Sequence, residues 1–203
     1  ANGYGHDTVV AGRAFVNAGA DWLGVSTTQA AVKLRDAGIN APVLVFLPTD
    51  PQNQADLISR QITLTVLSVE QVISCARAAR EAGRAADVHC YIDTGLGRIG
   101  SEDSLPDIIQ ACQRYPRVNL QGVYTHCGPR GSGTLLEGIE VFRSGASARA
   151  FAGLAQDSIN RYGGGRIMLH CAASSNYLQE SKTHLDMVRI GTLLYGQAPA
   201  DVD

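Results

Sequence analysis

Short apolar runs, rich in β-branched residues and bounded by turn-forming residues, recur along the chain. The runs are Trp22–Ser26, Pro42–Pro48, Ile62–Ser68, Asp87–Asp93, Asn119–His126, Arg166–Ala173 and Met187–Gly196. They are continuously apolar rather than alternating, which is typical of parallel strands buried on both faces. The pattern therefore predicts seven buried parallel strands.

Segments with the apolar period of an amphipathic helix accompany these runs. Examples are Gly5–Gly19, Thr28–Ala37, Val69–Ala82, Leu105–Tyr115 and Glu137–Asn160. Helices alternating with parallel strands indicate an α/β fold. A strand ending just before Ala1 would give the leading helix its partner and complete the count of a TIM barrel. We therefore predict a TIM (β/α)8 barrel that lacks its first strand in this chain, with residues 1–196 as the barrel and 197–203 as a linker leaving it.

A doubly wound open sheet would also accommodate this number of strands. Its dinucleotide-binding fingerprint is weak here, because Gly95–Gly100 fits G-x-G-x-x-G but holds the charged Arg98 and no helix follows it directly. The barrel is therefore the preferred prediction.

Composition narrows the class of protein. Of 203 residues, 45% are hydrophobic and 18% charged, which is typical of a globular domain. The net charge of −2 gives no basic surface for nucleic acid or a membrane. No apolar run is long enough for a transmembrane helix. The five cysteines are widely spaced without a C-x-x-C, which disfavours a disulfide framework or a zinc site and favours a cytoplasmic location.

Polar residues cluster where the predicted strands end, which is where a barrel forms its active site. They are Ser26, Thr27, Thr49, Ser68, Asp93, Thr94, Arg98, His126, His170 and Ser174. Arg189 differs because it lies inside the last apolar run, where an arginine is costly unless it is paired or binds a ligand. Two roles fit Arg189: an internal salt bridge or a contact with a ligand. His126 and His170 are either buried core residues with their hydrogen bonds satisfied or members of a functional site.

The lysines are informative because there are only two, Lys33 and Lys182. The first lies in a predicted helix and the second in the connection that precedes the last run. Neither lies where a barrel places its chemistry, so a cofactor-carrying lysine is not available within this chain. The sequence also lacks the G-x-S-x-G of hydrolases, and its histidines and aspartates make no convincing metal site.

Motifs in a fixed order resemble those of the alanine racemases. Ala1–His6 is similar to the segment that follows the family's cofactor-carrying lysine, and Asp93–Gly100 to its Asp-Thr-Gly-x-Gly-Arg-x-Gly signature. Gly122–His126 is similar to its Thr-His strand end, and His170–Ser174 to its His-Ala-Ala-Asn-Ser motif. Met187–Gly191 with Leu194–Gly196 is similar to its closing strand. The matches cover nearly the whole chain. The resemblance implies the barrel of an alanine racemase-type enzyme without the family's C-terminal β domain.

The resemblance implies pyridoxal 5'-phosphate as cofactor. Its phosphate would be bound by the hydroxyls of Tyr4 and Ser174 and by backbone N–H groups near Ser174 and Gly191. Ser174 follows a predicted strand and opens a short helical segment, where N–H groups favour an anion. A plain helix N-cap is the alternative role for this serine.

Arg189 would face the pyridine nitrogen of the cofactor. Because arginine keeps its protons, that nitrogen would stay unprotonated and the ring would be a weaker electron sink, which favours racemisation over transamination. Arg98 would help position the substrate carboxylate or a hydroxyl network on the cofactor side, with a surface or loop-bracing role as the alternative. His126 and His170 would orient tyrosine and arginine partners around the ring.

The implied reaction is the interconversion of L- and D-alanine by two bases, which supplies D-alanine for the cell wall. The bases would be a lysine directly before Ala1 and a tyrosine from the C-terminal domain of a partner subunit, so we expect a homodimer and no catalytic base in these residues. Alone, the chain is expected to be inactive. A serine or broad-specificity racemase of the same family, and a non-catalytic pyridoxal phosphate-binding barrel, are the alternatives.

Two positions depart from the family pattern. Tyr91 stands where many members carry a lysine that braces the substrate-site arginine, so another anion, for example a bound chloride, would have to hold Arg98. Ala173 stands where the family has asparagine before Ser174; either the alanine is tolerated there or a shifted register lets Asn176 supply the amide.

Overall fold

A computed structural model describes residues 2–94, 99, 103–126, 145–162, 166–179 and 181–198. They form two compact units, Ala1–His89 with Ala111–Leu120, and Cys90–Gln110 with Gln121–Asp203. Arg98, most of its glycine-rich loop, and residues 199–203 of the expected linker lie outside the described residues.

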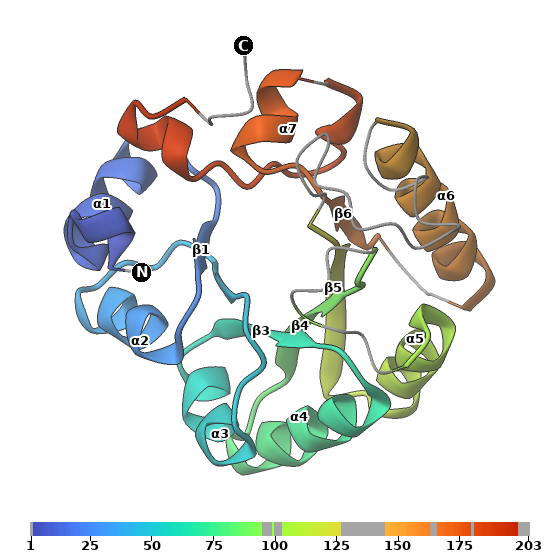
Figure 1. The fold of residues 1–203 in the computed structure, drawn as a ribbon. Helices are drawn as coiled ribbons and strands as arrows, with labels where there is room; N and C mark the ends of the chain where they lie inside the picture. The colour runs from blue at the N-terminus through green and yellow to red at the C-terminus, as the bar shows by residue number, and fades with distance from the viewer. Residues whose placement is uncertain are drawn as a thin grey trace. The chain divides into compact units, whose positions relative to one another are not determined.

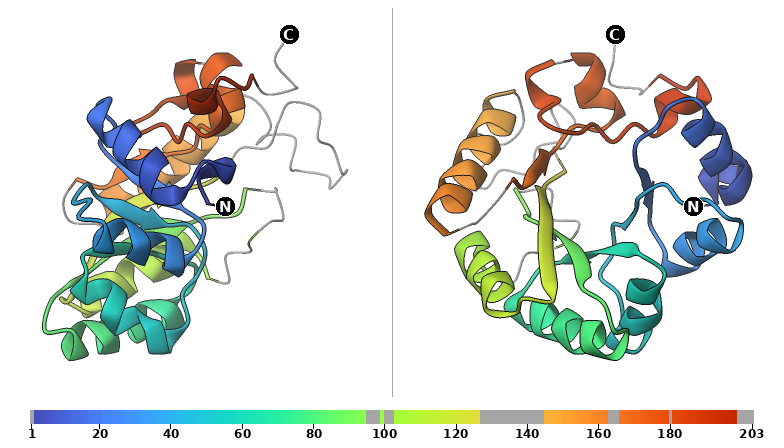
Figure 2. Two further views of the ribbon diagram at one scale, coloured as in Figure 1. Left: turned by 90° about the vertical axis from the view of Figure 1, so that its left-hand side faces the viewer. Right: turned by 180° about the vertical axis from the view of Figure 1, so that it is seen from behind.

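The first unit alternates helices and strands from its beginning. Its elements are α1 (Thr8–Asn17), β1 (Leu23–Val25), α2 (Thr28–Asp36), β2 (Val43–Val45), α3 (Pro51–Ser59), β3 (Ile62–Val66) and α4 (Val69–Glu81), preceded by a short 3-10 turn, η1 (Gly3–Gly5). The pairs β1/β2 and β2/β3 are parallel. Helices α1 to α4 all lie on the same side of strands β1 to β3 (Figure 1), and the view from behind in Figure 2 shows the same arrangement.

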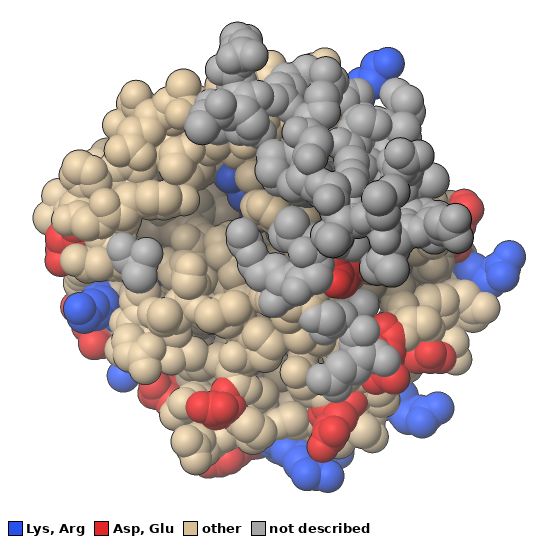
Figure 3. Space-filling view, in the orientation of Figure 1, with Lys and Arg blue, Asp and Glu red and all other residues tan. Residues whose placement is uncertain are grey.

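Burial explains why these residues form these elements. Every residue of β2 and β3 is buried, as expected for parallel strands covered on both faces. Helix α4 buries Val72, Cys75, Ala76 and Ala79, which share one face at helical spacing. Charged side chains of this unit gather over α2, α3 and α4 (Figure 3).

Two of the polar residues expected at strand ends start helices. The Oγ1 of Thr27 accepts the N–H of Ala30 at 3.3 Å, and the Oγ of Ser68 accepts the N–H of Gln71 at 3.2 Å. Both are N-caps, of α2 and α4 respectively. Their polarity is therefore explained by helix initiation.

The second unit completes β4 (Ala86–Tyr91), α5 (Leu105–Arg114) and β5 (Val118–Tyr124), each of which begins or ends in the first unit. It then adds α6 (Gly145–Tyr162), β6 (Met168–His170), α7 (Ser174–Gln179), η3 (Ser181–Thr183) and η4 (Thr192–Tyr195). Strands β5 and β6 are parallel, with Tyr124 opposite His170. The sheet order is β1-β2-β3-β4-β5-β6, which is the chain order.

Six predicted strands are confirmed, and the prediction of a strand over Met187–Gly196 is wrong. The Asp186 N–H donates to the Leu169 carbonyl and the Arg189 N–H to the Ala172 carbonyl, so the segment does lie beside β6. These two donors are three residues apart, whereas a parallel ladder repeats every second residue. Residues Thr192–Tyr195 then coil into η4. The segment Met187–Gly196 is therefore an apolar run with an irregular backbone and not a strand.

Four predicted helices are confirmed within a few residues of their expected ends. For Glu137–Asn160, the part from Gly145 onward lies in α6, and residues 137–144 lie outside the described residues. Of the described helices, none has the length and apolar character needed to cross a membrane. The described residues also hold no cluster of histidine, cysteine and carboxylate side chains suited to a metal ion.

The described cysteines, Cys75, Cys90, Cys112 and Cys171, form no disulfide among themselves, and all are buried. Burial raises the pKa of Cys75 and of Cys112 to about 12. Both thiols therefore stay protonated at neutral pH and pack as small apolar groups.

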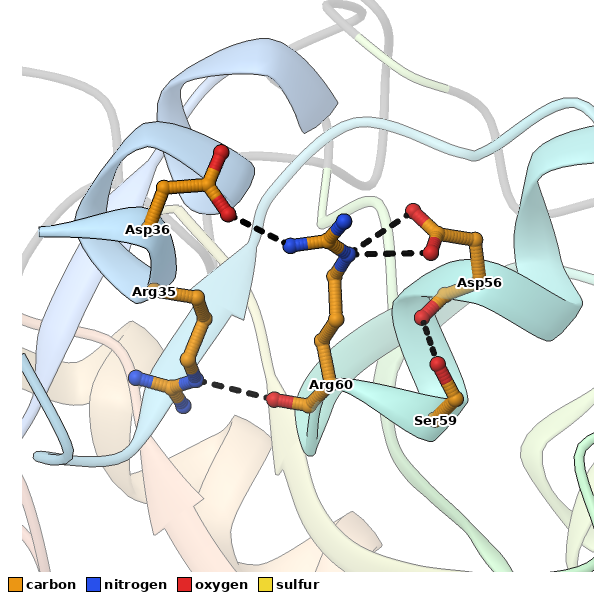
Figure 4. Close-up of polar contacts among 5 residues, drawn as sticks. All are labelled: Arg35, Asp36, Asp56, Ser59 and Arg60. Carbon is orange, nitrogen blue, oxygen red and sulfur yellow. Dashed lines mark hydrogen bonds and ion pairs between the residues drawn. The ribbon is translucent and has the colours of Figure 1, made fainter. Parts of the chain in front are cut away.

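A network of arginines connects the loops that follow α2 and α3 (Figure 4). Arg35 donates from Nε to the Arg60 carbonyl at 2.9 Å, from Nη1 to the Ile39 and Ala41 carbonyls at 2.7 and 2.8 Å, and from Nη2 to the Gln61 carbonyl at 2.9 Å. These carbonyls lie just before β2 and β3. One side chain thus fixes the entry of two neighbouring strands into the sheet.

The ends of the four helices of the first unit offer a test of backbone strain. Helices α1, α2 and α4 are followed by Gly19, Gly38 and Gly83 with positive φ, but α3 is followed by Gln61 with φ 58°. Since only glycine adopts this region without cost, we expect Gln61→Gly to raise the free energy of unfolding by about 0.5–1 kcal/mol in urea denaturation. The matched control Gly38→Ala should lower it by about 1 kcal/mol, because Gly38 has φ 75°. A Cβ there meets nothing within 4 Å, so the backbone conformation alone carries this cost. Equal stability of both variants and the unmodified protein would contradict this.

Candidate functional site

The guanidinium of Arg189 is held at the carboxyl ends of β5 and β6, within the second unit. Its Nη1 donates to the Nδ1 of His170 at 2.8 Å. Its Nη2 donates to the carbonyl oxygens of Thr125 at 2.7 Å and Cys171 at 3.1 Å. Thr125 directly follows β5 and Cys171 directly follows β6. The ends of two neighbouring strands therefore fix one half-buried cation.

The contact with Arg189 defines the protonation state of His170. Arginine has N–H donors and no acceptor, so the His170 Nδ1 accepts this hydrogen bond and the ring proton lies on Nε2. His170 is 0% exposed, and a neutral ring avoids burying a second positive charge beside the guanidinium. The pair thus carries one positive charge, on Arg189.

Stacked rings support the same pair. The rings of Tyr124 and His170 are parallel, with centroids 4.8 Å apart and an interplanar angle of 4°. The Cζ of Arg189 lies 5.3 Å from the centroid of Tyr124, and Tyr91 meets Tyr124 edge-on at 5.1 Å. Cation–π and aromatic contacts of this kind restrict the rotamers of all four side chains. The strand register, with Tyr124 opposite His170, creates this stack.

A second polar contact joins the two segments that follow β6. The backbone N–H of Gly191 donates to the Oγ of Ser174 at 3.0 Å. Ser174 is the first residue of α7 and is 7% exposed, and Gly191 directly precedes η4. The Ser174 hydroxyl and the Gly191 N–H therefore meet at one point. Gly191 lies two residues after Arg189 in the chain.

Comparison with known proteins identifies the family. The family model described as "Alanine racemase, N-terminal domain" matches residues 1–199. The chain belongs to the alanine racemase family.

Individual alanine racemases agree with this assignment. The alanine racemase of Desulfovibrio desulfuricans is 37% identical over 205 residues, covering 99% of this chain and 53% of that protein. The alanine racemase of Methanococcus maripaludis is 30% identical, covering 100% of this chain and 53% of that protein. The chain therefore spans about half the length of the curated alanine racemases it matches.

Solved alanine racemases share the fold. That of Clostridium difficile 630 superimposes with a TM-score of 0.84 at 28% identity, covering 98% of this chain and 51% of that chain. That of the D-cycloserine-producing Streptomyces lavendulae gives 0.82 at 31% identity, covering 98% and 51%. The α/β fold of parallel strands and intervening helices is thus the one seen in alanine racemases.

Within this member of the alanine racemase family, the structure brings some predicted site residues together and not others. His170 contacts Arg189, and Ser174 contacts Gly191. His126 follows Thr125 and is half-buried. Tyr4 belongs to the other unit, where its side chain is 58% exposed. Arg98 lies outside the described residues.

The two departures from the alanine racemase pattern have distinct surroundings. Tyr91 is 3% exposed, and its ring packs against Tyr124. Near Ala173, the Oδ1 of Asn176 accepts the N–H of residue 173 at 3.4 Å, so Asn176 does direct its amide group to this backbone.

Sequence reasoning expected His170 to orient an arginine, but it missed the other groups that hold Arg189. Tyr124 reads as one more apolar residue of β5, and the carbonyls of Thr125 and Cys171 carry no side-chain signal. Only the pairing of β5 with β6 places them together. A tyrosine directly before the Thr-His pair of an alanine racemase-like strand end was the one available hint.

Proposed function

We propose that this chain is the cofactor-binding half of a pyridoxal phosphate-dependent racemase that interconverts L- and D-alanine. The observation that carries the proposal is the guanidinium of Arg189, fixed by neutral His170 and two strand-end carbonyls. A donor-only cation held this firmly suits a ligand that presents a ring-nitrogen acceptor. The family assignment supports the same function.

The residues present fit pyridoxal 5'-phosphate. The phosphate needs several hydrogen-bond donors, and Ser174 and Gly191 offer a hydroxyl and an N–H at one point. On binding, the Gly191 N–H would exchange the Ser174 oxygen for a phosphate oxygen, and the serine hydroxyl would donate as well. The hydroxyl of Tyr4 would be a third donor. Arg189 would donate to the pyridine nitrogen.

When bound, pyridoxal phosphate supplies an aldehyde for the substrate amine and a ring that draws electrons from the α-carbon. Arg189 cannot release a proton to the ring nitrogen at neutral pH. Neutral His170 and the stacked Tyr124 hold the guanidinium in place, so a ring nitrogen beside it would stay unprotonated. This would favour racemisation over transamination.

Racemisation removes a proton from one face of the α-carbon and delivers one to the other face, which two bases on opposite sides can do. In our proposal these are a lysine preceding Ala1 and a tyrosine from the C-terminal domain of a partner subunit, in a homodimer with shared active sites. Arg98 would bind the carboxylate of the small amino-acid substrate, and His126 would help orient the residues around the ring. The barrel would hold eight strands, the first of them before Ala1. The enzyme would be cytoplasmic and would supply D-alanine for the synthesis of peptidoglycan.

The test uses the full-length protein. Borohydride reduction followed by peptide mapping should find a pyridoxyl group on a lysine directly before Ala1. Incubation with L-alanine should then yield D-alanine by chiral chromatography, with L-serine converted more slowly. Faster conversion of L-serine would reassign the substrate. Pyridoxyl labelling without any racemisation would support a non-catalytic cofactor-binding protein, and no labelling would overturn the proposal.

Ser174→Ala should weaken the binding of pyridoxal phosphate. A hydrogen bond to a charged group is worth about 1.5–3 kcal/mol, so the dissociation constant should rise at least about tenfold. The measurement is an absorbance titration of the cofactor-free, full-length protein. Ser175→Ala, one residue further along α7, is the matched control and should bind like the unmodified protein. Equal affinities of both variants would remove Ser174 from the phosphate site.

A further inference from the structure

The segment before α1 has an unusual backbone. Asn2, Gly3, Tyr4 and Gly5 have successive φ angles of 51°, 60°, 54° and 95°, so four residues in a row lie in the left-handed region. Two of them, Asn2 and Tyr4, are not glycine. Asparagine tolerates this region, whereas the conformation is unfavourable for tyrosine. Such a turn persists only where surrounding contacts hold it in place.

The side chain of Asn2 supplies such contacts. Its Oδ1 accepts hydrogen bonds from both the N–H and the Oγ1 of Thr8, each at 3.3 Å. Thr8 is the first residue of α1 and is 7% exposed. Within the turn, the N–H of Gly5 donates to the Asn2 carbonyl at 3.1 Å. Asn2 thus ties the left-handed turn to the buried start of the helix, and η1 packs against α1.

Helix α1 has a separate N-cap. The carboxylate of Asp7 accepts the N–H groups of Val9 and Val10 at 2.8 and 3.1 Å, which lowers the pKa of Asp7 below its ordinary value. A side-chain cap on these N–H groups is what a helix start ordinarily uses. The bonds from Asn2 to Thr8 are therefore additional to the cap, and they fasten the turn rather than start the helix.

The residue that this turn presents is Tyr4. Its side chain is 58% exposed, so packing covers less than half of it, and the backbone of the turn sets the direction in which the ring leaves the chain. A rigid turn restricts where the hydroxyl at the end of such a ring can lie.

We infer that Asn2 is a positioning residue for the cofactor phosphate, acting through Tyr4 by anchoring the left-handed turn to Thr8. This inference rests on the proposed function, in which the Tyr4 hydroxyl binds the phosphate. It predicts that loss of the Asn2 side chain weakens binding of the phosphate and leaves binding of the pyridine ring unchanged.

The experiment compares Asn2→Gly with Asp7→Gly in the full-length, cofactor-free protein. Both changes keep a residue that tolerates positive φ and remove one side-chain acceptor at the start of α1. Each variant is titrated with pyridoxal phosphate and with pyridoxal, which lacks the phosphate. Asn2→Gly should raise the dissociation constant of pyridoxal phosphate about fivefold, the equivalent of one neutral hydrogen bond, with pyridoxal unchanged. Asp7→Gly should change neither.

Rescue and coupling complete the test. Asn2→Asp keeps the acceptor oxygen. At about 1 M salt, which screens its added negative charge, it should bind pyridoxal phosphate like the unmodified protein under the same conditions. Combined with Tyr4→Phe, Asn2→Gly should add no further loss, because its effect passes through the Tyr4 hydroxyl. Additive losses, an equal loss for pyridoxal, or an equal effect of Asp7→Gly would overturn the inference and leave the proposed function standing. A normal affinity in Tyr4→Phe would instead remove Tyr4 from the proposed phosphate site, and the inference with it.

Discussion

Replacing Arg189 by leucine is expected to lower kcat/KM for alanine racemisation by about 100-fold or more, the range seen when one electrostatic donor is removed from an active site. In the proposed site, the change removes the donor to the pyridine nitrogen. It also leaves the Nδ1 of buried His170 without the hydrogen bond from Arg189. The measurement is steady-state racemisation by the full-length enzyme saturated with pyridoxal phosphate.

A second variant of the same residue separates loss of structure from loss of chemistry. Arg189→Glu offers a carboxyl group that can share a proton with the ring nitrogen and so strengthens the ring as an electron sink. Racemisation should fall as in the leucine variant, while release of pyruvate from alanine, the mark of transamination, should rise above that of the unmodified enzyme.

Arg166→Leu is the control for these variants. The Arg166 side chain is 94% exposed and lies 3.9 Å from the carboxylate of Asp186. The substitution therefore removes an arginine from the same unit, at a surface ion pair that contributes little to stability. Its activity should match that of the unmodified enzyme. Racemisation that survives in Arg189→Leu would exclude this arginine from the cofactor site.

Replacing Arg35 by methionine is expected to lower the free energy of unfolding by about 2 to 4 kcal/mol. A hydrogen bond to a charged group contributes about 1.5–3 kcal/mol net of water, and none of the four bonds is fully buried, so their contributions do not add in full. Four carbonyls before β2 and β3 share this one guanidinium. Burial lowers the pKa of Arg35, yet an arginine stays charged at neutral pH. Urea denaturation of the full-length protein measures the change.

Arg60→Met is the matched comparison (Figure 4). Arg60 binds the carboxylates of Asp36 at 2.7 Å and Asp56 at 2.9 Å, which raise its pKa, but those two side chains are 62% and 59% exposed. Exposed ion pairs gain little because water and salt screen them. Arg60→Met should therefore destabilise the protein much less than Arg35→Met. The reverse order would show that the ion pairs, and not the carbonyl bonds, fix these loops.

Local sequence was sufficient for most of the fold. The runs around β2 and β3 are so apolar that only burial on both faces accommodates them, and the caps at Thr27 and Ser68 mark where helices begin. The run Met187–Gly196 misled the prediction, because apolar character reports burial and does not report backbone conformation. A residue can be buried beside β6 without joining a regular ladder.

By itself, the sequence determined that this protein is a globular α/β chain of alternating helices and strands, and its motifs identified the alanine racemase family. Those properties depend on neighbours a few positions apart, through helical period, strand composition and capping. The tertiary structure decided what holds Arg189. Its partners come from residues 125, 170 and 171, which lie up to 64 positions away in the chain. Whether a buried arginine finds a carboxylate, a ring or a carbonyl depends on which strand ends lie next to one another, and strand pairing is fixed only when the sheet folds.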